Sequence, residues 1–132
     1  MPADRQEIVC RPDATKPITI VPGVTLRPLL GAGAPGLFTG LLIVEPGARY
    51  PHYSRPCTEA LTLLEGEAAI DAEDRRYPLG VLDNATVPKQ LPRRVVNLSS
   101  AGTATFHVAL SANTPSQAWV NARFTPVEQP VT

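Results

Sequence analysis

The stretch GARYPHYSRPCTEALTLLEG, residues 47–66, joins a dense polar segment to a run of alternating apolar residues. Leu61 and Leu63 lie two and four positions after Glu59, so all three side chains share one side of an extended strand. An isolated buried carboxylate is costly, and a carboxylate on the core side of a strand must be paired, coordinated or protonated. The stretch therefore predicts a strand that carries an acidic group into the interior.

Short apolar segments of the same kind occur along most of the chain. The 15 prolines and nine glycines interrupt every pattern long enough for a helix. Between them lie segments rich in apolar or β-branched residues, at positions 18–21, 24–30, 37–45, 59–66, 67–73, 84–88, 94–98 and 104–110. Gly66 and the acid-rich stretch around DAEDRR, residues 71–76, provide turns. Short strands at nearly even spacing predict an all-β sandwich or barrel.

Length and charge limit the classes of function. A chain of 132 residues has room for one domain. Twelve basic residues balance twelve acidic ones, so no long-range field favours nucleic acid or a membrane surface. The N-terminus lacks the apolar core of a signal peptide, and no apolar run approaches the roughly 18 residues that span a bilayer. We expect a cytoplasmic protein with no nucleic-acid or membrane partner.

The chain divides into three parts. We expect an N-terminal tail over residues 1–16, a barrel over 17–112 and a C-terminal segment over 113–132, where Trp119 and Phe124 favour packing against the barrel or a second subunit. The two cysteines, Cys10 and Cys57, have no CxxC spacing, so neither a disulfide framework nor a structural zinc site is predicted. For Cys57, which follows a proline in a turn, we expect an inert buried thiol.

Two longer stretches resemble the paired motifs of the cupin superfamily. PGARYPHYSRPCTEALTLLEGEA (46–68) is similar to the first motif, in which a glycine, five residues, His-x-His, a glutamate and a second glycine follow in order. LDNATVPKQLPRRVVN (82–97) is similar to the second, with Asp83, Pro88 and Asn97 at matching spacing. The resemblance covers residues 23–110. It implies a small jelly-roll β-barrel of two antiparallel sheets, often dimeric, and we expect a homodimer through the N-terminal strand or a sheet face.

The metal-ligand positions of the motifs are altered here. In metal-bearing cupins two histidines and a glutamate of motif one and a histidine of motif two hold a divalent metal. The motif-two histidine position is Arg93, and the motif-two glycine positions are Leu82 and Gln90. For motif one, a first alignment puts His52 and Ser54 at the histidine positions and a second puts Tyr53 and Arg55 there. The proline-cysteine pair after Arg55 and the five-residue gap after Gly47 favour the second alignment.

These changes replace lone pairs with positive charge. A guanidinium has five donors and no lone pair for a metal, so the simplest account is that Arg93 replaces the metal as the counter-charge of Glu59. His107 lies opposite Phe106 and Val108 on its strand. It faces solvent if Phe106 faces the core, or lines the pocket if the lumen is the polar side. No metal is favoured; if one is bound, it is a divalent Fe, Mn, Zn or Ni held by His52, Glu59 and His107.

Two functions remain open from the sequence. In the first, the barrel lumen binds a small acidic or polyhydroxylated molecule, with the metal site largely lost. The residues expected to form that site are His52, Tyr53, Arg55, Glu59 and Arg93. In the second, an altered metal site supports a cupin enzyme, namely a dioxygenase, isomerase or lyase acting on a small oxygenated substrate. Whether any reaction is catalysed stays open.

Overall fold

The computed structural model describes residues 9–29 and 37–111, and these contain nine strands and one short 3-10 helix. The 3-10 helix η1 spans Pro12–Ala14. The strands are β1 (Ile18–Val21), β2 (Val24–Pro28), β3 (Phe38–Val44), β4 (Glu59–Glu65), β5 (Ala68–Ala72), β6 (Arg75–Leu79), β7 (Asn84–Val87), β8 (Arg93–Asn97) and β9 (Ala104–Leu110). Among the described residues no helix is long and apolar enough to span a membrane.

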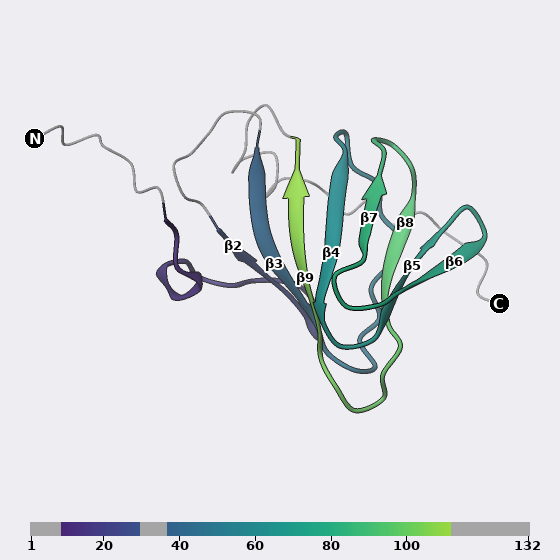
Figure 1. The fold of residues 1–132 in the computed structure, drawn as a ribbon, viewed down its shortest axis with the longest axis horizontal. Helices are drawn as coiled ribbons and strands as arrows, with labels where there is room; N and C mark the ends of the chain where they lie inside the picture. Colours follow the sequence, from purple (N-terminus) through teal and green to yellow (C-terminus); the bar gives the residue numbers. More distant parts are fainter. Residues whose placement is uncertain (1–8, 30–36, 112–132) are drawn as a thin grey trace, which may run out of the picture.

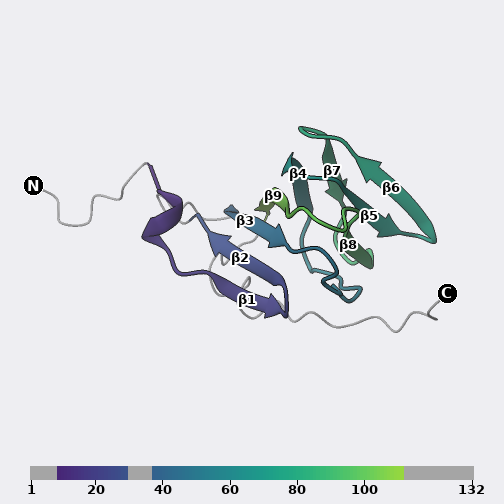
Figure 2. The same cartoon turned by 90° about the horizontal axis from the view of Figure 1, so that it is seen from below.

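The strands form two antiparallel sheets. The larger has the order β1-β2-β3-β9-β4-β7, and the smaller has the order β6-β5-β8. Figures 1 and 2 show the pair β1 and β2 at one side of the molecule and the smaller sheet at the other. The predicted all-β jelly-roll barrel is confirmed by this arrangement.

Side chains along the strands alternate between buried and half-buried, because one face of each sheet packs against the other sheet. In β3 every second residue is buried, beginning with Phe38 and ending with Val44, and the residues between them are half-buried. The strand β9 shows the same pattern. Since successive side chains of a strand point to opposite faces, one face of each sheet forms the core. Its largest apolar members include Leu26, Phe38, Leu42, Leu61, Leu63, Ile70, Phe106 and Leu110. Each such side chain contributes about 1.5–3 kcal/mol by its burial.

The turn after β4 needs its glycine. Gly66 has φ +97°, and a Cβ there would lie 2.5 Å from the backbone oxygen of Thr103. A larger residue is therefore excluded by both conformation and space. The predicted turn in the DAEDRR stretch is also present, with Glu73 and Asp74 at φ values of 53° and 60° between β5 and β6.

The sequence did not predict β6. This strand lies at the edge of the smaller sheet, its residues are mostly exposed, and it contains Pro78. An edge strand in contact with water needs no alternating apolar pattern and tolerates a proline, so the usual strand signals are absent.

Part of the expected N-terminal tail packs on the larger sheet. The guanidinium of Arg27 on β2 donates from Nη1 to the backbone oxygens of Pro12 (2.7 Å) and Thr15 (2.5 Å). The hydroxyl of Thr15 donates to the backbone oxygen of Pro28 at 2.5 Å. These bonds fix η1 beside β2. The expectations for Trp119, Phe124 and the segment 113–132 fall outside the described residues.

Candidate functional site

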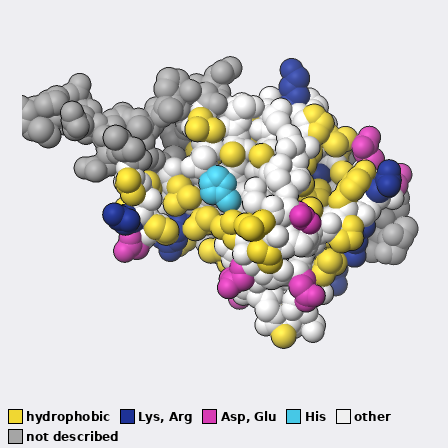
Figure 3. Space-filling view, viewed as in Figure 1, with side chains coloured by type: hydrophobic (Ala, Val, Ile, Leu, Met, Phe, Trp, Pro, Cys, Tyr) yellow, Lys and Arg dark blue, Asp and Glu magenta, His cyan; other side chains and the backbone are white. Residues whose placement is uncertain are grey.

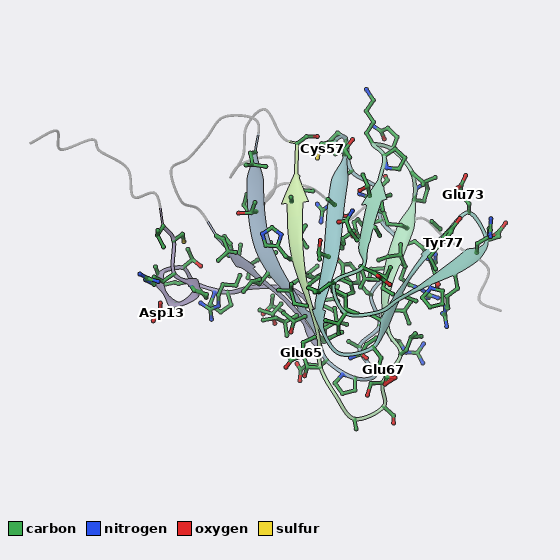
Figure 4. All side chains as sticks on the ribbon, viewed as in Figure 1. Asp13, Cys57, Glu65, Glu67, Glu73 and Tyr77 are labelled. Carbon is green, nitrogen blue, oxygen red and sulfur yellow. The ribbon has the colours of Figure 1, made fainter. Side chains whose placement is uncertain are left out.

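The candidate site is built around a buried carboxylate at the start of β4. Glu59 is only 1% exposed and lies on the same face as Leu61 and Leu63, as its position in the strand predicts. Figure 4 shows Cys57, two residues earlier, at the end of the barrel where β4 begins, and Glu65 at the opposite end. The carboxylate therefore lies inside one end of the barrel.

Three side chains donate hydrogen bonds to this carboxylate. The Tyr53 hydroxyl donates to Oε1 at 2.8 Å, and Arg55 Nε donates to Oε2 at 3.1 Å. Arg93 donates to Oε1 from Nη2 at 3.0 Å and from Nε at 3.2 Å, and its Nη1 donates to the backbone oxygen of Leu91 at 2.7 Å. Both oxygens of Glu59 are thus bonded, which is what a buried charge requires.

The backbone brings the donors together from two separate segments. Tyr53 and Arg93 form an isolated antiparallel bridge, in which the backbone nitrogen of each residue lies 2.8 Å from the backbone oxygen of the other. The Gln90 N–H also donates to the Arg55 oxygen at 2.7 Å. Within a bridged segment side chains alternate in direction, so Tyr53 and Arg55 point inward together. Their inward direction is the one that the second motif alignment predicts.

Aromatic rings pack against both guanidiniums. The ring of Tyr53 stacks on that of Tyr50, with centroids 5.1 Å apart and planes 16° apart. The Cζ atoms of Arg55 and Arg93 lie 4.9 Å and 4.8 Å from the Tyr53 centroid, within cation–π range. All five side chains of this group, which we call the inner cluster, are at most 2% exposed: Tyr50, Tyr53, Arg55, Glu59 and Arg93.

Burial fixes the ionisation of the two phenols. It raises the pKa of Tyr53, and the neighbouring Glu59 charge raises it further. It likewise raises the pKa of Tyr50, with a further contribution from Tyr53. Burial alone would lower the pKa of Arg55, but the charge and hydrogen bond of Glu59, together with Tyr53 and Tyr50, outweigh burial and raise the pKa. Both phenols of the inner cluster are therefore neutral at neutral pH.

Solved structures with a similar fold identify the fold class of this chain. An RmlC-like cupin from Shewanella frigidimarina NCIMB 400 matches with a TM-score of 0.67 at 18% identity, over 82% of this chain and 95% of that one. KdgF from Halomonas sp. matches with 0.66 at 13% identity, over 78% and 92%. A sugar phosphate isomerase of the cupin superfamily from Silicibacter pomeroyi DSS-3 matches with 0.65 at 22% identity, over 77% and 74%. The protein has a cupin fold.

The likeness rests on structure alone. No protein-family model and no curated protein matches the sequence. At identities of 13–22% the three structures establish the fold, and the chemistry has to be argued from the side chains.

The side chains at the cupin metal positions do not fit a metal as they are arranged. Glu59 is the one carboxylate there, and its oxygens accept from Tyr53, Arg55 and Arg93. Guanidiniums offer no lone pair and repel a cation. Within residues 9–29 and 37–111 no three histidine, cysteine, aspartate or glutamate side chains gather as a metal site.

The two histidines lie away from the inner cluster. His107 is half-buried on β9 and points to the side opposite Phe106 and Val108, both of which are in the core. Of the two alternatives for His107, the structure therefore shows the outward one. His52 precedes the inward Tyr53, and its pKa is lowered by partial burial and by the charge of Arg94.

The structure thus corrects two residue sets. The alternative metal set of His52, Glu59 and His107 is not brought together, because only Glu59 points into the barrel. Of the expected ligand-binding residues, Tyr53, Arg55, Glu59 and Arg93 meet, whereas His52 does not. Sequence reasoning missed Tyr50, which lies between β3 and β4 and outside the positions that the motif specifies.

The motif-two glycine positions keep the backbone conformation of glycine. Leu82 and Gln90 have φ values of 75° and 68°. This left-handed region is unfavourable for residues with a Cβ, by about 1–2 kcal/mol each. The cupin backbone is therefore retained at these turns although the glycines are gone.

Cys57 lies close to the inner cluster without joining it. Its side chain is half-buried against the core, and burial raises the pKa of its thiol above the ordinary value. A raised pKa keeps the group protonated at neutral pH, and thiols in that state are poor nucleophiles and poor metal ligands.

Proposed function

We propose that the barrel binds a small acidic or polyhydroxylated molecule at the inner cluster, where guanidiniums stand at the metal-ligand positions of the cupin motifs. The observation that carries the proposal is that Arg55 and Arg93, both at most 2% exposed, share a single carboxylate. Guanidiniums form strong and often bidentate hydrogen bonds with carboxylates and phosphates, so two buried arginines at these positions favour an anionic partner.

The two guanidiniums have different roles in this proposal. All three nitrogens of Arg93 donate within the protein, to Glu59 and to Leu91, so Arg93 positions the carboxylate. Arg55 donates to Glu59 from Nε at 3.1 Å, and we assign it the contact with an acidic group of the ligand because guanidiniums match the geometry of carboxylates and phosphates. Tyr50 stacks on the Tyr53 ring, and the Arg55 guanidinium lies over that Tyr53 ring.

Access to the cluster depends on residues 48–58. This segment lies between β3 and β4, and the isolated bridge at Tyr53 is its one strand-like pairing to the described barrel. A segment held by few backbone bonds opens at lower free energy than a continuous ladder. Ligand entry through this segment therefore costs less than entry through a sheet.

One similar structure has a substrate of this ligand class in its name. It is described as a sugar phosphate isomerase, an enzyme whose name implies a small, anionic and polyhydroxylated substrate. The alternative of a metal-dependent cupin enzyme predicts instead a stoichiometric divalent metal. Metal analysis of protein purified without a nickel column or chelator is expected to give well under one equivalent, and a full equivalent that is lost in Glu59→Gln would favour the alternative.

The direct test is a thermal-shift series with matched anionic and neutral ligands. Gluconate and glucose 6-phosphate are expected to raise the melting temperature more than sorbitol and glucose at equal concentration, since a ligand of the folded state alone stabilises by RT ln(1 + [L]/Kd). The shift should disappear in Arg55→Gln and persist in Arg76→Gln, which removes a guanidinium from the protein surface. Equal shifts in both variants, or none in the unaltered protein with any of these anions, would contradict the proposal.

A further inference from the structure

The loop between β7 and β8, residues 88–92, lies at the same end of the barrel as the inner cluster. Val87, the last residue of β7, pairs with Glu59 at the start of β4. Figure 1 shows the loop running from the tip of β7 to the start of β8. We call residues 88–92 the rim loop. It therefore begins beside the residue that carries the buried carboxylate.

Two hydrogen bonds tie the rim loop to the arginines of the inner cluster. The Gln90 N–H donates to the backbone oxygen of Arg55 at 2.7 Å. The Leu91 backbone oxygen accepts from Nη1 of Arg93, also at 2.7 Å. The position of the loop is thus fixed relative to both arginines. Its bond to Arg55 also places Gln90 against the segment through which we expect a ligand to enter.

Gln90 holds a backbone conformation that suits glycine. Its φ of 68° lies in the left-handed region, which is unfavourable for a residue with a Cβ. Pro88 and Pro92 restrict the backbone on either side of it. The Gln90 side chain is exposed, so burial does not offset the strain. A strained residue that gains nothing from packing and lies beside a candidate site points to a role in that site.

Leu82 shows that strain alone does not mark the site. It has φ 75° and is 72% exposed, so it resembles Gln90 in conformation and exposure. Its N–H donates to the backbone oxygen of Leu63, two residues before Glu65. Figure 4 shows Glu65 at the end of the barrel opposite Cys57. Leu82 therefore shares the strain of Gln90 but lies away from the inner cluster.

The rim loop brings an amide and an ammonium group to this end of the barrel. The side-chain amide of Gln90 has both donors and an acceptor, which matches a hydroxyl group that donates and accepts. Lys89 is exposed beside it, and Figure 3 shows a basic side chain projecting from this end of the molecule. An exposed ammonium group is screened by water and salt, so it attracts anions without distinguishing among them. Selection among acidic ligands therefore falls to Gln90.

We propose that Gln90 is a specificity-determining residue, which hydrogen-bonds the hydroxyl groups of a ligand whose acidic group is bound by Arg55. The inference rests on the proposed function. It narrows the ligand to a molecule that is both acidic and polyhydroxylated, such as a sugar acid, and disfavours a plain carboxylic acid. The strain at Gln90 is then the cost of placing an amide where glycine would leave no side chain.

Isothermal titration calorimetry with gluconate and hexanoate tests the proposal. Both are six-carbon carboxylates, and only gluconate carries hydroxyl groups. The unaltered protein is expected to bind gluconate more tightly. Gln90→Ala removes the amide but keeps a Cβ in the left-handed conformation. It should weaken gluconate binding about tenfold, the effect of losing one or two hydrogen bonds, and leave hexanoate binding unchanged.

A pair of glycine variants separates the amide from the strain. Gln90→Gly and Leu82→Gly each relieve a left-handed residue, so both should raise the melting temperature by a few degrees. Gln90→Gly should also lose the preference for gluconate, whereas Leu82→Gly should keep it.

The outcomes distinguish this inference from the proposed function. If the unaltered protein binds neither acid, the proposed function is wrong and the inference is overturned with it. If it binds both acids equally, or if Gln90→Ala and Gln90→Gly keep the preference for gluconate, the inference alone is overturned, and the anion site at Arg55 stands.

Discussion

Two groups of ion pairs in this protein each join one carboxylate to two guanidiniums, one group in the interior and the other at the surface. Inside the barrel Glu59 pairs with Arg55 and Arg93, and on the smaller sheet Asp71 pairs with Arg76 and Arg94. We call the second group the surface cluster. The inner guanidiniums are 2% and 0% exposed, whereas the surface ones are 47% and 39% exposed.

The difference in exposure means that the two groups contribute differently to stability. Exposed pairs are screened by water and salt, and contribute little to stability. A buried group of charges is costly to assemble and more costly to break, because losing one partner leaves the other uncompensated. The inner cluster is therefore not explained by stability alone, and this supports the proposal that it binds a ligand. The surface cluster needs no such explanation.

The largest effect is expected from Glu59→Gln. The variant keeps the shape of the side chain but removes the carboxylate charge that two buried guanidiniums share, so the free energy of unfolding should fall by about 3–5 kcal/mol. Urea unfolding followed by circular dichroism measures it. A loss below about 1 kcal/mol would mean that the inner cluster is as well hydrated as the surface cluster.

Sequence reasoning reached the inner cluster through strand alternation. The side chain of Glu59 was placed inward because it shares a face with two leucines. Arg93 was placed beside it from its position in the second motif, and the structure has it 0% exposed. The barrel was predictable for the same reason, since its buried faces produce the apolar pattern. What alternation cannot reach is a residue outside a strand, and Tyr50 is one: no period applies to the loop that holds it.

Two further limits have physical causes. His52 was grouped with the inner residues from motif spacing alone, yet the bridge at Tyr53 turns its neighbour outward toward Arg94. The first two residues of β6, Arg75 and Arg76, were read as part of a turn because they are exposed and charged, and the rest of the strand was not assigned. Both errors concern exposed or singly paired backbone, where burial does not constrain which residue type is present.

A smaller effect is expected from Tyr53→Phe. The change removes one hydroxyl donor to the buried carboxylate but keeps the ring against Tyr50, and Glu59 Oε1 still accepts from Arg93. Hydrogen bonds to charged groups are worth about 1.5–3 kcal/mol, so we expect a loss near the lower end of that range.

The surface provides the matched control for this tyrosine. Tyr77 is 39% exposed and has the Arg75 guanidinium over its ring, so Tyr77→Phe makes the same chemical change beside a cation in water. It should alter stability by less than about 0.5 kcal/mol. If the two variants lose stability equally, burial does not distinguish the two regions and the comparison fails.

The smallest effect is expected from Asp71→Asn, which removes the charge of the surface cluster. Pairs of this exposure contribute about 0.2–1 kcal/mol at neutral pH, and high salt should reduce the difference.

The hydrogen bonds from Arg76 and Arg94 lower the pKa of Asp71 in the folded protein. Its contribution is therefore complete above the unfolded value of about 3.9 and disappears as the pH falls through the lowered folded value. Urea titrations of both proteins at neutral pH and near pH 2.5 should show the gap closing on acidification, and a gap that widens instead would mean that the folded-state pKa is raised.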